Sequence, residues 1–253
     1  MRMKSAVALT AVTLASVACL MPAAPAAAST GAVRPKAASG PLGNERLSDE
    51  KTLTRWAYPF KRGAIRSRLT SKSRAIALLH YETEDHVPET YIVLRSKLDN
   101  LDRVWLQIRV PGRPNGRTGW VPRGAMGQLH PIETYLRINR TTLHATLFKH
   151  GKQIWRSPIG VGKASTPTPR GHFWVRERIH NLGGGGVYGP WAFGTAAYSV
   201  LSDWPGGGVI GIHGTNEPGL IPGRPSHGCV RVPNTKILQL KRLMPIGTPV
   251  EIV

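Results

Sequence analysis

The apolar residues of this chain occur in short segments separated by turn-forming residues, and this pattern constrains the fold more than any other feature. Over residues 104–110, apolar side chains alternate with Gln107 and Arg109, as in a strand that buries one face. A Pro-Asn-Gly turn signal follows at 114–116 and leads into another short segment at 118–122. The pattern predicts a mainly β fold.

Two β modules are expected. The first covers residues 55–128, where about five short strands would form a small barrel. The second covers 131–253 and combines consecutive strands with one helix at 235–243, for which Asn234 would be the N-cap and Pro245 the stop, so we predict a β-sandwich. Further expected strands are residues 75–81, 90–96, 134–139, 143–149, 153–161, 171–176 and 248–252.

The N-terminal residues have the pattern of a secretory signal peptide. Arg2 and Lys4 precede an apolar stretch, and small residues that allow cleavage after Ala28 follow it. The apolar stretch has about 15 residues, fewer than the roughly 20 of a membrane-spanning helix. We therefore predict a signal peptide at 1–28, export to the cell envelope or the extracellular space, and a flexible, Gly- and Pro-containing linker at 29–54.

The chain is strongly basic, with a formal net charge of +20. Without the two basic residues of the predicted signal peptide, 32 Lys and Arg face 14 Asp and Glu, a net charge of +18. Such a charge favours an anionic partner, and for an exported protein this means acidic wall polymers or lipid headgroups. The sequence has none of the aromatic and basic signatures of common nucleic-acid modules, so no nucleic-acid partner is expected.

Cysteine usage singles out one thiol. Cys19 would leave with the signal peptide, so Cys229 would be the sole cysteine of the mature protein and could form no internal disulfide. It is then paired with another chain, buried and inert, or free and reactive. In an alternative, Cys19 is the lipidated residue of a lipoprotein, although Ser16 departs from the usual signal.

The segment 210–234 contains the residues that could make this thiol reactive. A nucleophilic cysteine needs a neighbouring imidazole, and His213 and His227 both lie in the segment. A tight turn with Gly228 precedes Cys229 and would bring backbone N–H groups close to a developing oxyanion. A metal site built from the two histidines and the cysteine is the alternative, but no further ligand lies at a suitable spacing, so no metal is expected.

These residues form a longer pattern. The sequence IHGT at 212–215, SHGCVR at 226–231 and Asn234 together resemble the signature of the L,D-transpeptidase catalytic domain. Three more segments extend the resemblance over about 120 residues: IGVGK at 159–163, TPTPRGHF at 166–173 and GTPV at 247–250. Upstream, residues 103–122 are similar to the end of a bacterial SH3-like domain, whose function could be wall binding or packing alone.

The resemblance implies a role for each residue of the signature. Cys229 would be the nucleophile and His213 its base, with the carbonyl of Gly214 orienting the imidazole. Arg231 would bind a carboxylate of the stem peptide, although some members of the family have Asn at this position. The oxyanion pocket would be shaped by Ser226, His227 and Gly228.

The reaction implied is acyl transfer between peptidoglycan stem peptides, which forms 3→3 cross-links through a thioester and needs no cofactor. Three alternatives stay open: an L,D-carboxypeptidase that uses water as acceptor, a non-catalytic wall-binding protein, and an envelope nucleic-acid or lipid binder. The sequence does not specify the acceptor, the diamino acid of the stem or the oligomeric state.

Overall fold

The computed structural model describes residues 43–180, 186–203 and 205–253. The predicted signal peptide, with Cys19, lies outside these residues. Both β-sheets belong to one compact unit of the chain. Within the described residues, no helix is long and apolar enough to cross a membrane.

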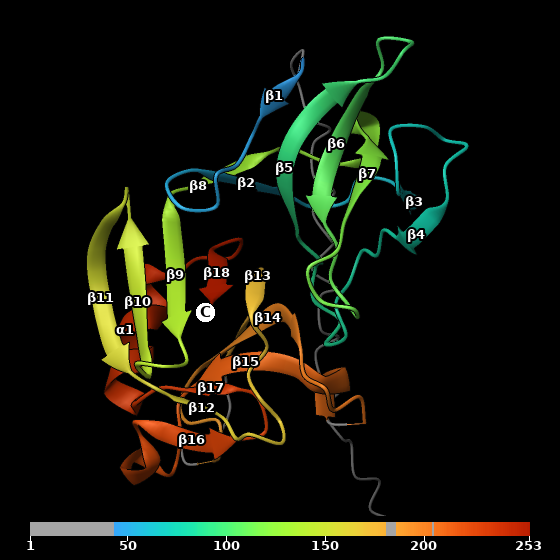
Figure 1. The fold of residues 1–253 in the computed structure, drawn as a ribbon. Coiled ribbons are helices and arrows are strands. Elements are labelled where there is room, and N and C mark those ends of the chain that lie inside the picture. Colours follow the sequence, from blue (N-terminus) through green and yellow to red (C-terminus); the bar gives the residue numbers. More distant parts are fainter. Residues whose placement is uncertain (1–42, 181–185, 204) are drawn as a thin grey trace, which may run out of the picture. The chain divides into compact units, whose positions relative to one another are not determined.

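The first sheet has the strand order β4-β3-β7-β6-β5-β2-β8, with β1 paired to β5 (Figure 1). Strand β6 is the segment in which alternation was predicted, and its Leu106 and Ile108 are buried in the core of this sheet. The strands are β1 (Glu45–Arg46), β2 (Thr54–Ala57), β3 (Ala64–Arg66), β4 (Ala75–Leu78), β5 (Tyr91–Leu98), β6 (Val104–Arg109), β7 (Thr118–Pro122) and β8 (His130–Ile132).

The boundaries of this sheet differ from the expected modules. Glu45–Arg46 pairs with β5, and Leu47 is only 3% exposed, so the end of the predicted linker is part of the fold. At the other end, β8 pairs with β2 rather than with the second sheet, to which residues from 131 were assigned. Both segments are too short to show a periodicity, and their partners lie far away in the sequence.

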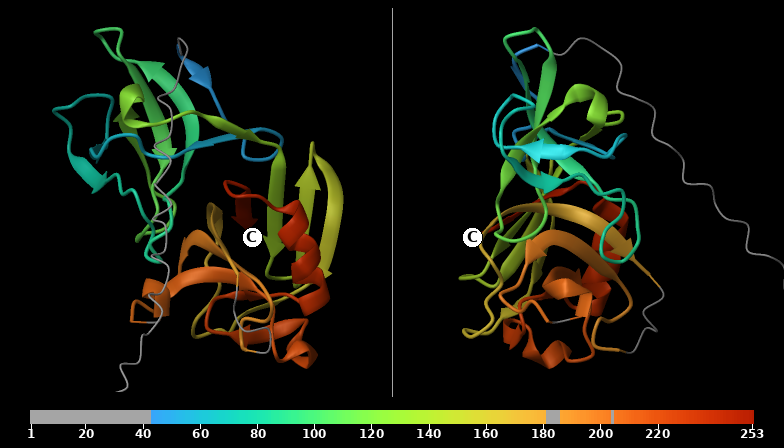
Figure 2. Two further views of the ribbon diagram at one scale, coloured as in Figure 1. Left: turned by 180° about the vertical axis from the view of Figure 1, so that it is seen from behind. Right: turned by 90° about the vertical axis from the view of Figure 1, so that its right-hand side faces the viewer.

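The second sheet has the order β11-β10-β9-β18-β13-β14-β15-β17-β12-β16. Its apolar face packs around the helix α1 (Asn234–Leu243), whose Ile237 and Leu240 are fully buried; Figure 2 shows the helix beside β9–β11. The strands are β9 (Thr134–Asn139), β10 (His144–Lys149), β11 (Lys152–Pro158), β12 (Gly160–Gly162), β13 (Gly171–Ile179), β14 (Ala192–Tyr198), β15 (Val209–His213), β16 (Gly223–Ser226), β17 (Val230–Arg231) and β18 (Pro249–Ile252).

The prediction of a mainly β fold with one helix is confirmed, while the SH3-like character of the first sheet stays a prediction. The expected N-cap is wrong. Pro233 occupies the cap position, and Asn234 is the first helical residue. The Asn234 side chain instead accepts a hydrogen bond from the Thr215 N–H at 2.8 Å, because it faces the loop that follows β15.

Candidate active site

The pairing of the parallel strands β15 and β17 brings His213 and Cys229 close together. The two strands are parallel, with Ile212 opposite Val230 and His213 opposite Arg231. This register continues to Gly211 beside Cys229, and His213 lies two residues after Gly211, on the same face of the strand. Gly211 lies between the two side chains: a Cβ at this glycine would be 3.5 Å from Cδ2 of His213 and 3.8 Å from Sγ of Cys229. The Gly211 N–H also donates a hydrogen bond to Sγ at 3.3 Å.

The imidazole of His213 is held in one tautomer. The side chain is 4% exposed, and its Nδ1 lies 2.6 Å from the carbonyl oxygen of Gly214, which can only accept. Nδ1 therefore carries the proton, and Nε2 is left with its lone pair. The Tyr188 ring packs against the imidazole in a T-shaped arrangement, with 5.0 Å between the ring centroids.

Burial keeps both groups in their neutral forms. Burial lowers the pKa of His213 to about 4. The hydrogen bond to Gly214 opposes this shift, and the nearby positive charge of Arg231 adds to it. Burial also raises the pKa of the Cys229 thiol, although the Gly211 N–H and Arg231 oppose this shift. At neutral pH the site thus holds a thiol beside a neutral imidazole, and not a thiolate–imidazolium pair.

The turn before Cys229 is fixed by buried hydroxyl groups. Ser226 Oγ accepts the Gly228 N–H at 3.1 Å and donates to the Cys229 carbonyl at 2.6 Å. Thr168 Oγ1 donates to the Gly228 carbonyl at 2.7 Å. Gly228 has a φ of +128° and its Cβ would lie 2.8 Å from Cδ1 of Ile210, so this position favours glycine. These contacts set the position of the thiol.

A second set of contacts fixes the carbonyl that orients His213. Asn234, at the start of α1, binds the N–H of Thr215, the residue after Gly214. The Gly214 N–H donates to the Trp191 carbonyl at 3.1 Å. A Cβ on Gly214 would collide with Oδ1 of Asn234 and lie 3.1 Å from Cα of Gly189, so only glycine fits here. The Asn234 role was missed because the helix pattern assigned that residue to a cap.

His213 and Cys229 open into a cavity of about 500 Å³. Tyr188 lines it, as do two acidic residues that the sequence gave no reason to select: Glu177 on β13 and Asp85 from the first sheet's β4–β5 connection. No local pattern marks either residue, because the topology brings them to Cys229 from more than 50 and 140 positions away.

The other predicted site residues are arranged differently. Among the described residues, the cavity wall does not include Ser226, His227 or Gly228. The N–H of Gly228 is taken by Ser226, and Nε2 of His227, an exposed residue, lies 3.3 Å from Nζ of Lys163.

Arg231 is already paired with a carboxylate. Its Nη1 lies 2.6 Å from Oε2 of Glu217, and its side chain is largely buried. A substrate carboxylate would have to displace Glu217 to reach it. Over the described part of the chain, no three His, Cys, Asp or Glu side chains are grouped as ligands for a metal ion.

The residues of the second sheet are similar in sequence to known proteins. Residues 133–252 match the model of the L,D-transpeptidase catalytic domain family, YkuD. Over 122 residues, the chain is 35% identical to a protein assigned as L,D-transpeptidase YkuD in Bacillus licheniformis and 34% identical to its counterpart in Bacillus subtilis. In each case the match covers 48% of this chain and 66% of the relative.

Solved structures include an Enterococcus faecium L,D-transpeptidase, with 25% identity, a TM-score of 0.38 and coverage of 47% of this chain and 49% of that one. A Mycobacterium smegmatis L,D-transpeptidase is 13% identical, with a TM-score of 0.39 and coverage of 87% and 94%. The matched residues include His213, Cys229 and the turn that precedes Cys229. By its sequence, the segment 133–252 thus matches the YkuD family of L,D-transpeptidase catalytic domains.

Proposed function

We propose that this protein is an exported peptidoglycan L,D-transpeptidase that forms 3→3 cross-links through a thioester on Cys229. The observation that carries the proposal is the placement of His213 and Cys229 on the two sides of Gly211, with Nδ1 of the imidazole bonded to Gly214. This arrangement leaves Nε2 as the base beside the only thiol among the described residues.

The chemistry has two steps. In the first, Sγ attacks the carbonyl that joins the third residue of a tetrapeptide stem to its terminal D-alanine, while Nε2 of His213 takes the thiol proton. The same proton passes to the nitrogen of the leaving D-alanine as the C–N bond breaks, and a thioester remains. In the second step the side-chain amine of another stem attacks the thioester, loses a proton to His213, and releases the Cys229 thiol.

Because both groups start neutral, the proton transfer accompanies the attack on the carbonyl. The Cys229 N–H is the donor that we assign to the oxyanion, since the Gly228 N–H is bound by Ser226. The predicted contact of Arg231 with a substrate carboxylate would require Glu217 to move, so we place Arg231 in the framework of the site rather than in contact with the substrate.

A product analysis with a disaccharide-tetrapeptide tests the proposal. The protein should convert it to a cross-linked dimer with release of D-alanine, and the Cys229→Ala variant should not. Tripeptide without dimer would indicate an L,D-carboxypeptidase, in which water is the acceptor. No conversion by a folded protein would favour the non-catalytic, wall-binding alternative.

A further inference from the structure

The cavity that contains Cys229 is built by both sheets. Asp85 and Val87, from the connection between β4 and β5, line it together with residues of β13, β14 and β15. The first sheet therefore supplies part of the wall against which a substrate of the catalytic domain would lie.

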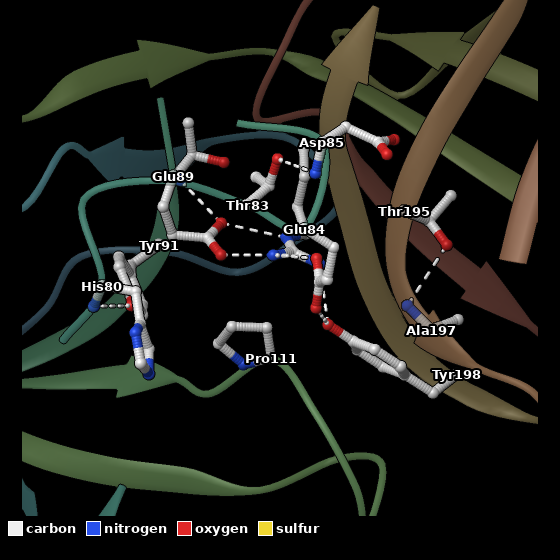
Figure 3. A network of polar contacts seen from close by, with 12 residues as sticks. His80, Thr83, Glu84, Asp85, Glu89, Tyr91, Pro111, Thr195, Ala197 and Tyr198 are labelled. Atoms are coloured by element: carbon white, nitrogen blue, oxygen red, sulfur yellow. Dashed lines mark hydrogen bonds and ion pairs between the residues drawn. The ribbon is translucent and has the colours of Figure 1, made fainter. Parts of the chain in front are cut away.

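The connection is fixed to the catalytic domain by a buried ion-pair network. Arg176 on β13 donates Nε to Oε1 of Glu89 at 2.9 Å and Nη2 to the other oxygen of the same carboxylate. The same guanidinium reaches Oε2 of Glu84 at 3.0 Å and the Tyr198 hydroxyl at 2.9 Å (Figure 3). The side chains of Arg176 and Glu89 are each 2% exposed, so the segment that carries Asp85 is held firmly.

Within this wall, two carboxyl groups meet. Glu177 follows Arg176 on β13, is 5% exposed, and interacts with the side chains of Thr83 and Asp85. The facing residue on β14 is Gly194, where a Cβ would lie only 2.5 Å from Oε2 of Glu177. The glycine thus leaves room for a carboxyl group on the cavity wall.

The two guanidinium groups nearest this pair among the described residues are bound to other partners. Arg176 is committed to Glu89 and Glu84, and Arg178, which also lines the cavity, donates to the Lys241 carbonyl at 2.6 Å and lies over the Trp191 ring. Burial, followed by the Asp85 charge, raises the pKa of Glu177 to about 7, against the opposing effect of Thr83 and Arg176. Two interacting carboxyl groups, of which Glu177 is buried, are unfavourable in their charged forms unless a proton or a cation accompanies them.

We propose that Asp85, together with Glu177, binds the primary ammonium group of the stem peptide's diamino acid, which makes the first sheet's β4–β5 connection a specificity-determining part of the active site. The inference rests on the proposed function. A stem peptide for this reaction carries a side-chain ammonium near the reacting carbonyl of the donor or as the acceptor nucleophile, and a carboxylate pair is the complement of such a group.

Binding to an inactive chain tests the proposal without turnover. The full-length Cys229→Ala protein would be titrated calorimetrically with disaccharide-tetrapeptide whose side-chain amine is either free or acetylated. The free amine should bind about tenfold more tightly, the effect of one charged hydrogen-bonded contact. Adding Asp85→Asn should abolish this difference, whereas the matched control Glu82→Gln, an exposed acid of the same segment, should preserve it.

Equal binding of both peptides, or an equal loss of affinity for both with Asp85→Asn, would overturn the proposal. Because Asp85 is exposed, its substitution removes no core contact. Product analysis with the otherwise native chain then distinguishes the two sources of the ammonium group. If Asp85→Asn releases D-alanine more slowly, the bound ammonium group is that of the donor peptide. If release is unchanged but more tripeptide and less dimer form, the bound ammonium group is that of the acceptor peptide. A chain that discriminates the amines but turns over no substrate would refute the proposed function alone.

Discussion

Replacing Arg176 by Met would remove the cation that holds the first sheet against the catalytic domain. The guanidinium and the Glu89 carboxylate are joined by two hydrogen bonds and are almost completely buried, so the variant leaves an acid without its partner in a site that water does not reach. Removal of one partner from a buried pair costs about 3–5 kcal/mol of unfolding free energy. We expect a loss in this range for Arg176→Met at neutral pH.

The loss of unfolding free energy would be measured by urea denaturation, with tryptophan fluorescence as the readout. The matched control is the Arg176→Met/Glu89→Gln double variant. The double variant should recover a large part of the loss, because the buried Glu89 charge is gone and the remaining acid, Glu84, is partly exposed to water. Burial raises the pKa of Glu89, so its protonation favours the folded state, and in Arg176→Met stability should fall as the pH rises through that pKa. A single-variant loss below about 1 kcal/mol at neutral pH, outside the range for a buried pair, would refute this reasoning.

Three further predictions concern the site and the charge. Alkylation of Cys229 by iodoacetamide should accelerate only towards alkaline pH, because the pKa of the thiol is raised and His213 is neutral above about pH 4. Rapid, pH-independent alkylation near pH 6 would instead indicate a preformed thiolate–imidazolium pair. Gly228→Ala should lower the free energy of unfolding by about 1–2 kcal/mol, because residue 228 has a positive φ, and it should slow D-alanine release. A variant with the urea midpoint and the turnover of the wild type would contradict this. Full-length protein should bind purified sacculi at low salt and be released at high salt, whereas salt-independent binding would exclude the net charge as its cause.

The sequence indicated the local structure of this protein better than its long-range contacts. The alternation at β6 and the strand at β9 could be predicted because neighbouring residues carry the signal. The placement of His213 beside Cys229 could be expected from a long motif whose residues lie within one segment. In contrast, the pairing of β1 with β5 and of β8 with β2 depends on partners that no local pattern identifies.

The same limit applies to the candidate site. Asp85 and Glu177 reach the cavity through the packing of two sheets, and Arg231 is occupied by Glu217, an acid 14 positions away in a loop. The helix pattern predicted the right range for α1 but the wrong role for Asn234, since capping preference cannot show that a side chain faces another loop.

The central claim is that Cys229 carries the acyl group during turnover. Native protein would be mixed with disaccharide-tetrapeptide, quenched with acid within the first turnover, digested, and analysed by mass spectrometry. We predict one adduct, with the mass of the donor less D-alanine, on the peptide that contains Cys229, and a reduced amount of it in His213→Gln. An adduct on another residue, or continued D-alanine release by Cys229→Ala, would contradict the account.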